Sequence, residues 1–258
     1  MLDQKFKVGI VVIGSLLWDN NLMPNDNLRA DWRRINLNVE QKISLLLPIR
    51  YGRKSGRGKN YTMVYDYELI TTKKMGIGYL LPLKEKESSI HEIIYQASIL
   101  SRAEGDNSRT TSKLCEVVKG QNDAWAVISC MVNPKITDSK KNALLNTWSN
   151  RTNISSLNYE KFTENEGVNL FSRNGMIENF WPQPIDVTNN IEVNTFDVLI
   201  TTITKKNIAN FPTDEELLED AKKDQRKYFY NNISNGINTF QDIDIINYAH
   251  NTAATPSS

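Results

Sequence analysis

Two short stretches of the sequence hold residues that could carry out chemistry together. The first is Gly14-Ser15, which interrupts the apolar run of residues 8–13. Glycine allows backbone conformations closed to other residues, and successive N–H groups in such a turn can converge on an anion. An ordinary Gly-Ser turn without a ligand is the alternative. The second stretch ends at Glu104, whose carboxylate could accept a proton and return it.

The helix that must position Glu104 is predicted over residues 89–103. Ser89 and Glu92 have the spacing of a capping box, and Gly105 stands where a helix stops. Four residues beyond the last apolar position of this helix comes Glu104, where the pattern requires an apolar residue. The apolar positions follow the i, i+3, i+4, i+7 spacing of one helix face: Ile90, Ile93, Ile94, Ala97 and Leu100.

Two effects are expected to raise the pKa of Glu104. Partial burial disfavours the charged form, and the unpaired carbonyl groups at a helix C-terminus repel an anion. Glu104 is therefore expected to be more basic than an ordinary carboxylate. The alternative is a frayed last turn, in which Glu104 lies in water or pairs with Arg102 or Arg109.

The scarcity of other reactive residues narrows the chemistry. His91 and His250 are the only histidines, so neither a Ser/His/Asp or Cys/His triad nor a zinc site with histidine ligands is expected. Cys115 and Cys130 are too few for a disulfide framework, and we expect both to be reduced in adjacent strands of a cytoplasmic protein. Carboxylates are the expected proton carriers.

Other charged clusters each have a structural and a functional interpretation. Arg33 and Arg34 follow Trp32 and are either solvated or form a clamp for a carboxylate or phosphate. Asp242 and Asp244 could bind a hard cation, but two aspartates make an incomplete site and a role in a local turn is favoured. No metal site is predicted.

The overall composition is that of a soluble globular protein. The 258 residues are 40% hydrophobic, and 31 basic residues balance 30 acidic ones. This balance gives no reason to expect nucleic acid or an anionic membrane as the main partner. Residues 8–18 follow Lys5 and Lys7 but lack a clear signal-peptide cleavage site, and no segment is long enough to span a bilayer. The oligomeric state is not indicated.

Residues 50–59 form the most basic stretch and are predicted to be a loop. Five basic residues alternate with three glycines there. Such a loop either wraps an anionic ligand or is a solvated excursion. RNA binding is disfavoured because the whole protein is neutral and Tyr51 is the only residue of the loop that could stack on a base.

Hydrophobic periodicity predicts a mixture of strands and helices. Residues 28–35 are either a short helix or the approach to a strand, and a weak boundary falls at Asn133-Pro134. Residues 61–66 and 75–82 are expected to pair as a hairpin. The predicted strands are 8–13, 43–49, 61–66, 75–82, 113–119, 125–132 and 196–203, and the helices are 89–103, 137–150 and one from Thr213 through Phe229.

The Gly14 turn and Glu104 together make the first 110 residues resemble the γ-glutamylcyclotransferase superfamily. Its members carry a Tyr-Gly-Ser type turn after the first strand and a later Leu-Asp-x-x-Glu-Gly type segment. These resemble Ile13-Gly14-Ser15-Leu16-Leu17-Trp18 and Leu100-Ser101-Arg102-Ala103-Glu104-Gly105. The Gly-Ser-Leu-Leu-Trp form, followed by Trp32-Arg33-Arg34, is most similar to the glutathione-degrading branch. The sequence departs from the pattern at Ile13, where an aromatic residue is usual, and at Ser101, which replaces the aspartate.

The resemblance implies an α+β fold with a small mixed-strand barrel flanked by helices. This γ-glutamylcyclotransferase-like domain is expected over residues 1–135. A helical or irregular C-terminal extension, residues 136–248, is expected to pack on it, and residues 249–258 are expected to be a disordered tail.

The resemblance also implies a reaction that needs no metal or cofactor. The γ-glutamyl group of a small amide or peptide cyclises to 5-oxoproline and releases the amine or peptide. Glu104 is then the catalytic base, and the N–H groups of Gly14, Ser15 and Leu16 hold the substrate α-carboxylate or the developing oxyanion. Arg50-Tyr51 is a further candidate for the pocket. The alternative, motivated by the departures at residues 13 and 101, is a catalytically inactive member that binds a small acidic metabolite or a protein partner.

Overall fold

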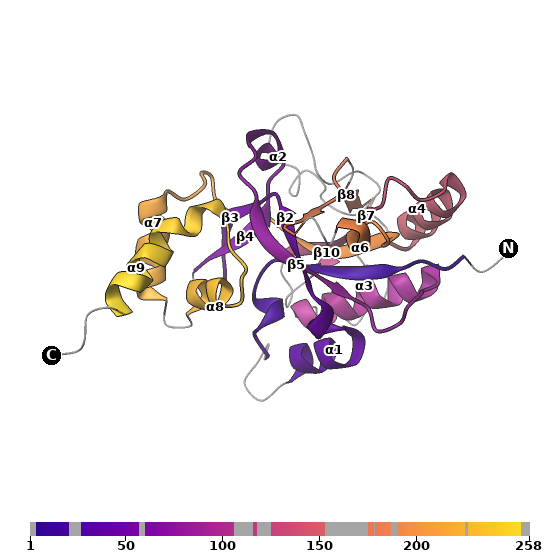
Figure 1. The fold of residues 1–258 in the computed structure, drawn as a ribbon, viewed down its shortest axis with the longest axis horizontal. Coiled ribbons are helices and arrows are strands. Elements are labelled where there is room, and N and C mark those ends of the chain that lie inside the picture. The colour runs from indigo at the N-terminus through magenta and orange to yellow at the C-terminus, as the bar shows by residue number, and fades with distance from the viewer. Residues whose placement is uncertain are drawn as a thin grey trace.

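A computed structural model places most of the chain. It describes residues 4–20, 27–56, 60–105, 116–117, 125–152, 175–177, 179–186, 190–224 and 227–253. The fold is α+β, with one curled sheet of parallel and antiparallel strands and helices packed around it (Figure 1). The fold class agrees with the sequence prediction, while the γ-glutamylcyclotransferase type of barrel stays a prediction.

The large sheet brings distant parts of the chain together. Its strand order is β6-β7-β10-β1-β5-β2-β9, with β8 beside β7. The β1–β10 and β7–β8 pairs are parallel, and the other pairs are antiparallel. The strands are β1 (Val8–Val12), β2 (Ile43–Leu47), β5 (Gly76–Pro82), β6 (Glu116–Val117), β7 (Ala126–Val132), β8 (Met176–Ile177), β9 (Gln183–Pro184) and β10 (Val198–Thr204).

A two-stranded hairpin and the helices complete the fold. The hairpin consists of β3 (Ile49–Lys54) and β4 (Tyr61–Tyr65). In Figure 1, α1 and α3 lie together at one side of the sheet, while α7, α8 and α9 gather at the end that carries β3 and β4. The helices are α1 (Leu28–Asn36), α2 (Glu68–Thr72), α3 (Ile90–Glu104), α4 (Asp138–Thr152), α6 (Asn190–Val193), α7 (Asp214–Lys223), α8 (Tyr228–Ser234) and α9 (Ile243–Ala253), with the short 3-10 turns η1 (Ser15–Leu17), η2 (Val39–Gln41) and η5 (Phe240–Asp242).

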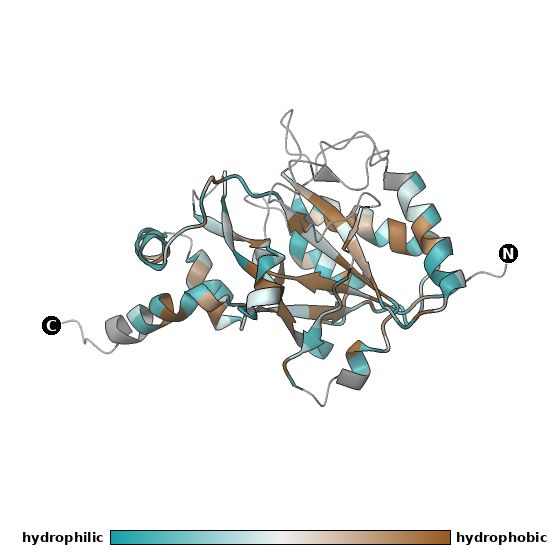
Figure 2. Ribbon diagram, turned by 90° about the horizontal axis from the view of Figure 1, so that it is seen from above, coloured by the Kyte–Doolittle hydropathy of each residue, from teal (hydrophilic) through white to brown (hydrophobic). Residues whose placement is uncertain are grey.

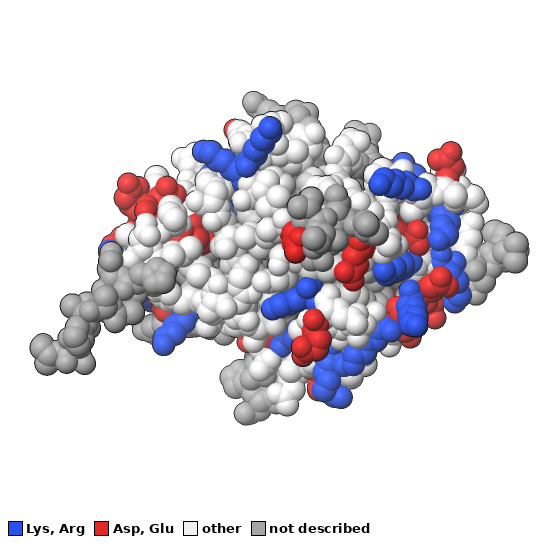
Figure 3. Space-filling model, viewed as in Figure 1, with Lys and Arg blue, Asp and Glu red and all other residues white. Residues whose placement is uncertain are grey.

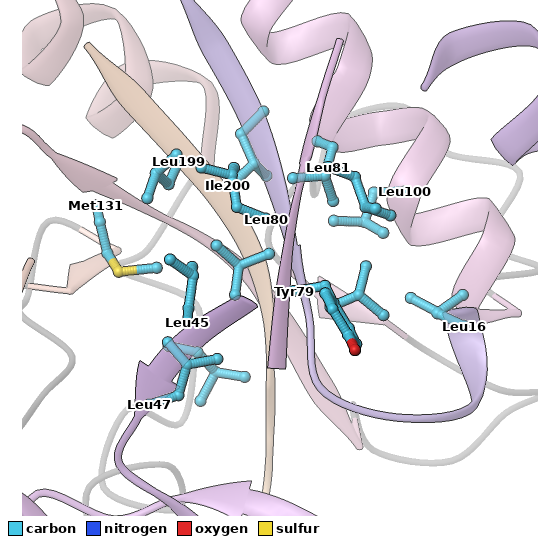
Figure 4. Close-up of a cluster of buried hydrophobic side chains, with 14 of the residues drawn as sticks. Leu16, Leu45, Leu47, Tyr79, Leu80, Leu81, Leu100, Met131, Leu199 and Ile200 are labelled. Carbon is cyan, nitrogen blue, oxygen red and sulfur yellow. The ribbon is translucent and has the colours of Figure 1, made fainter. Parts of the chain in front are cut away.

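The core is built on both faces of the central strands. Every residue of β1 is buried, as its β-branched composition predicts for a strand covered on two sides. Figure 2 shows that apolar residues concentrate in the strands and on single faces of the helices. In the close-up of Figure 4, Leu81 and Leu100 lie on one side of β5, and Leu45 and Met131 lie on the other.

Helix α3 forms as the sequence predicts. Ser89 and Glu92 make the capping box, and Gly105 ends the helix at φ 100°, a left-handed conformation that favours glycine. The buried positions include Ile93 and Leu100 of the predicted stripe. Glu104 is therefore held at the end of a well-capped helix.

Two local predictions in the first half are wrong. Residues 61–66 and 75–82 do not pair with each other, because β4 pairs with β3, while β5 lies between β1 and β2. The helix α2 separates β4 from β5, so the connection is not a tight hairpin turn. The loop predicted for residues 50–59 is also wrong in its first half, since Ile49–Lys54 is strand β3. Pairing with β4 outweighs its glycine and basic composition.

The second half also departs from the prediction. The helix predicted from Thr213 through Phe229 ends at Lys223, and α8 begins at Tyr228. Asp224 explains the break, because its Oδ2 accepts hydrogen bonds from the N–H groups of Tyr228 and Phe229. The chain between them therefore turns instead of continuing the helix.

The C-terminal extension predicted for residues 136–248 is not only helical or irregular. It supplies β10, which lies between β1 and β7 in the large sheet, so one sheet spans both sides of the predicted boundary at residue 135. The tail predicted for residues 249–258 is helical as far as Ala253, the end of α9. Residues 254–258 and Cys115 lie outside the described residues, whereas Cys130 is buried in β7.

The distribution of charged side chains on the surface agrees with the balanced numbers of basic and acidic residues in the sequence. On the face that Figure 3 shows, basic and acidic side chains are interspersed. None of the described helices combines the length and the apolar composition that a membrane span requires.

Candidate functional site

The Gly14-Ser15 turn directly follows β1 and is closed by its own backbone. The Leu17 N–H donates to the Gly14 carbonyl oxygen at 3.0 Å, and the Asp19 N–H donates to the Ser15 carbonyl oxygen at 2.7 Å. Among the described residues, no backbone carbonyl accepts a hydrogen bond from the N–H of Gly14, Ser15 or Leu16. Their role in holding an anion stays a prediction.

The reason for glycine at position 14 differs from the predicted one. Gly14 has φ −179° and ψ −145°, an extended backbone that is not confined to glycine by its φ. Space is the constraint, because a Cβ at this position would lie 3.1 Å from the Tyr228 hydroxyl oxygen. The turn therefore has a close neighbour that is distant in sequence.

Glu104 lies at the end of α3 with its side chain 10% exposed. Burial raises the pKa of Glu104, and the nearby Arg29 guanidinium and Thr202 hydroxyl oppose this effect. The direction agrees with the sequence prediction. Glu104 Oε2 lies 3.6 Å from Nη2 of Arg29, a partner that the sequence did not suggest. The alternative partner Arg109 lies outside the described residues.

Arg29 connects the turn to the carboxylate. The guanidinium of this buried α1 residue donates to Ser15 Oγ at 3.2 Å, to Asp19 Oδ2 at 3.0 Å and to the Ala103 carbonyl oxygen at 3.0 Å. Its Nη2 faces Glu104. One planar group with several donors thus brings together two segments that are about ninety residues apart in the sequence.

The arginine pair singled out in the sequence does not provide this connection. Arg33 donates to the Leu16 carbonyl oxygen at 2.5 Å and to the Asp19 carbonyl oxygen at 3.1 Å, so it fixes the outer side of the turn. Burial, followed by the charge of Arg29, lowers the pKa of Arg33. The exposed Arg34 pairs with Asp31 at 3.0 Å. The exposed position of Arg34 agrees with the solvated alternative, whereas Arg33 is buried against the turn.

Two residues of α8, which the sequence did not suggest for the site, lie beside the Gly14-Ser15 turn and Trp18. Burial raises the pKa of Tyr228 to about 12, with smaller upward contributions from Asp242 and Glu104. The Tyr228 ring packs against Trp18, with 6.1 Å between ring centroids. Asn232 is fully buried, and its Oδ1 accepts a hydrogen bond from Trp18 Nε1 at 2.7 Å. No spacing in the sequence relates residues 228 and 232 to residue 14, so only the fold reveals them.

Thr202 of β10 is the second neighbour of Glu104. Its side chain is close enough to lower the pKa of Glu104, yet Oγ1 is buried and makes no hydrogen bond of normal geometry within the described part of the chain. A buried hydroxyl without a full partner is unfavourable. It is a polar atom that a ligand or water could satisfy.

Arg50 and Tyr51 lie in a neighbouring cluster. The Tyr51 hydroxyl donates to Asp242 Oδ1 at 2.8 Å, and the Arg50 guanidinium lies 3.3 Å from Asp66 Oδ2 and stacks 3.7 Å from the Phe211 ring centroid. Burial, with Asp242 next, raises the pKa of Tyr51. Among the described residues, no hydrogen bond or ion pair joins either residue to the turn or to Glu104. Their place in a pocket stays a prediction.

The basic side chains of β3 fasten the C-terminal helices. Arg53 donates to the Lys205 carbonyl oxygen at 2.9 Å, and Lys54 pairs with Asp220 of α7 at 2.9 Å. Asn60, before β4, donates to Asp224. Arg53 and Lys54 of the basic stretch therefore bind this protein's own second half.

The described residues contain no group of three or more potential metal ligands. Asp242 instead belongs to a capping box with Thr239 and accepts a hydrogen bond from the Tyr51 hydroxyl, which is the predicted local turn role.

Comparison with protein-family models, curated proteins and solved structures finds no match for this chain. Its function must therefore be inferred from the site itself.

Proposed function

We propose that this protein is a γ-glutamylcyclotransferase-like enzyme that converts the γ-glutamyl group of a small amide or peptide into 5-oxoproline. The observation that carries the proposal is the Arg29 bridge, which joins Ser15 of the donor-rich turn to a buried, unusually basic Glu104. A base beside a cluster of hydrogen-bond donors is the arrangement that intramolecular acyl transfer requires.

The chemistry is balanced without an added reactant. The substrate α-amine loses a proton and attacks its own γ-carbonyl carbon, forming the ring C–N bond. The original amide C–N bond then breaks, and the leaving nitrogen takes up a proton. Glu104 is proposed to receive the first proton and return it to the leaving group, so the enzyme ends the cycle unchanged. No metal or cofactor takes part.

The proposed roles of the other residues follow from their positions. The N–H groups of Gly14, Ser15 and Leu16 are the donors for the substrate α-carboxylate or the developing oxyanion. Preorganised donors and a general base each typically contribute about 10²- to 10³-fold in rate. Arg29 orients Glu104 and keeps its pKa from rising further. Arg50 and Tyr51 contribute only indirectly in this proposal, through the C-terminal helices.

The proposal is tested by incubating the protein with glutathione and a set of other γ-glutamyl amides and detecting 5-oxoproline by mass spectrometry. Glu104→Gln is expected to lower the rate by about 10²- to 10⁴-fold, because the amide cannot accept the proton. Arg29 keeps its contact with Asp19 in this variant, and circular dichroism checks that the variant is folded. Glu40→Gln, at an exposed position, is the matched control and should leave the rate unchanged.

The pH dependence gives a second measurement. Because burial raises the pKa of Glu104 from 4.5, kcat/KM is expected to fall on the acid side at a pH above 4.5. Equal rates for the wild type and Glu104→Gln at neutral pH would remove Glu104 from the mechanism.

A catalytically inactive binding protein of the same fold is the second candidate. The Arg29–Glu104 ion pair favours it, because a purely structural carboxylate would make the same contact. Binding of small acidic metabolites without 5-oxoproline from any substrate would support this candidate. Under either proposal we place the protein in the cytoplasm, where γ-glutamyl peptides are found and a buried thiol such as Cys130 stays reduced.

A further inference from the structure

The side-chain amide of Asn232 has a defined orientation. Trp18 Nε1 is a donor only, and it donates to Asn232 Oδ1 at 2.7 Å. Reversing the amide would place two donors against each other, so the NH2 group must point away from Trp18. Asn232 is 0% exposed, and no described residue accepts a hydrogen bond of normal geometry from its Nδ2. The amide carries two N–H groups, and with one of them directed at the Tyr228 hydroxyl oxygen the other has no acceptor among the described residues.

The location of this amide is the proposed active site. Asn232 lies beside the Tyr228 hydroxyl and lowers the pKa of that group. The same hydroxyl oxygen lies 3.1 Å from the place a Cβ of Gly14 would take. The charge of Glu104 also acts on Tyr228. Trp18 contacts both Asn232 and Tyr228 and lies four residues after Gly14, so this turn of α8 brings the Asn232 amide toward the Gly14 turn.

The Tyr228 hydroxyl, like the Asn232 amide, is a neutral hydrogen-bond donor. Asn232 and the Met63 main chain lower its pKa, as groups do when they donate toward the phenol oxygen. Burial raises its pKa to about 12, so the phenol is neutral and carries a proton that it can donate. The α8 side of the site thus presents neutral donors, as the turn does.

The nearby cations are engaged elsewhere. Arg29 contacts Glu104, Ser15 and Asp19, and Arg33 contacts backbone oxygens of the turn. The available groups around the turn are accordingly neutral N–H and O–H donors. Several neutral donors match a carboxylate, which has two oxygens and about four acceptor positions.

We propose that Asn232 determines substrate specificity by donating from Nδ2 to the α-carboxylate of the γ-glutamyl group, with Trp18 as the positioning residue that holds the amide in the required orientation. This inference rests on the proposed function, since it names how that substrate is recognised. The enzyme then requires a free α-carboxylate on the γ-glutamyl unit. It rejects the corresponding α-carboxamide, because the NH2 group of the carboxamide would face the N–H and O–H donors of the site.

The test compares one γ-glutamyl amide with its α-carboxamide analogue in wild type and variants. Wild type is expected to prefer the carboxylate. Asn232→Asp keeps an acceptor for Trp18 but replaces the Nδ2 donor with a carboxylate oxygen. This oxygen repels the substrate carboxylate and can accept a hydrogen bond from the carboxamide N–H. The ratio of the two kcat/KM values is expected to fall by about 100-fold. Trp18→Phe, which lets the amide rotate, is expected to raise KM for the carboxylate by about tenfold with kcat retained.

Two controls keep the result interpretable. Asn231→Asp adds the same charge one residue away on α8, at a partly buried side chain, and is expected to leave the ratio within twofold of wild type. Circular dichroism and thermal unfolding identify variants that do not fold, and for those Asn232→Ala replaces the aspartate variant, with an expected rise of about tenfold in KM for the carboxylate alone.

Calorimetric binding of both compounds to Glu104→Gln separates the two proposals. Product from wild type together with an unchanged ratio in Asn232→Asp would overturn the specificity proposal and leave the enzyme proposal standing. No product from wild type, with carboxylate binding that depends on Asn232, would overturn the enzyme proposal alone. Equal binding of both compounds, or binding of neither, would overturn the specificity proposal.

Discussion

Glu104 and Asp242 are two buried carboxylates whose pKa values are both raised by burial, yet their surroundings differ. Both Asp242 oxygens are engaged, one by the Tyr51 hydroxyl at 2.8 Å and the other by the Thr239 N–H at 2.6 Å. Glu104 Oε2 lies 3.6 Å from the Arg29 guanidinium, beyond a normal hydrogen bond. A raised pKa therefore does not by itself identify a catalytic acid or base.

The comparison separates structural from chemical roles. Asp242 holds η5 against the β3–β4 hairpin and so keeps the C-terminal helices in place. Glu104 has one loose charged partner, Arg29, which also donates to Ser15 Oγ of the turn. The availability of the carboxylate, combined with its basicity, makes Glu104 the better candidate for proton transfer.

The largest effect on stability is expected from Arg29→Met. Removing a buried cation leaves Glu104 and Asp19 without it, which should cost about 3–5 kcal/mol in the free energy of unfolding. Urea denaturation measures the loss. The control Lys54→Met breaks the more exposed pair with Asp220 and should cost about 1 kcal/mol or less. Equal losses for the two variants would show that the buried contacts of Arg29 stabilise the protein no more than an exposed ion pair does.

Asp242 is expected to produce the next effect, seen as a pH dependence. Burial raises its pKa from 3.8 to about 6, so the stabilisation is complete below pH 4 and is lost as the pH rises through about 6. Relative to wild type, Asp242→Asn should gain roughly 3 kcal/mol between pH 4 and pH 7. Denaturation at several pH values measures this. Parallel curves for the two proteins would contradict the assignment.

Tyr51→Phe tests the boundary between the two regions. Loss of the hydroxyl bond to Asp242 should cost about 2 kcal/mol in the free energy of unfolding, since the acceptor is a carboxylate. If Tyr51 is purely structural, KM and kcat remain within twofold of wild type. A rise in KM with unchanged stability would instead support the sequence prediction that Tyr51 contacts substrate.

The smallest effect on stability is expected from Gly14→Ala. The added Cβ would lie 3.1 Å from the Tyr228 hydroxyl oxygen, which must shift by a few tenths of an ångström. A cost of about 1 kcal/mol or less is expected, because the backbone at Gly14 is extended and does not require glycine. KM is expected to rise although stability changes little, because in the proposed function both the turn and Tyr228 face the substrate. An unchanged KM would argue against a ligand at the turn.

The sequence alone determined the local parts of the site. The apolar run before Gly14, the capping box of α3 and the stripe that ends at Glu104 depend on residues close in the chain, and each formed as predicted. Burial of Glu104 followed from helix periodicity, and with it the direction of its pKa shift. The fold class was predictable for the same reason, because strand and helix patterns are local.

Only the tertiary structure decided which strands pair and which residues meet. The pairing of β4 with β3, the place of β10 beside β1, and the arrival of Arg29, Thr202, Tyr228 and Asn232 around Gly14 and Glu104 depend on contacts between distant segments. Such contacts arise from the burial of whole faces, and no spacing in the chain encodes them. The sequence therefore supplied a carboxylate and a turn, and the fold supplied the residues that surround them.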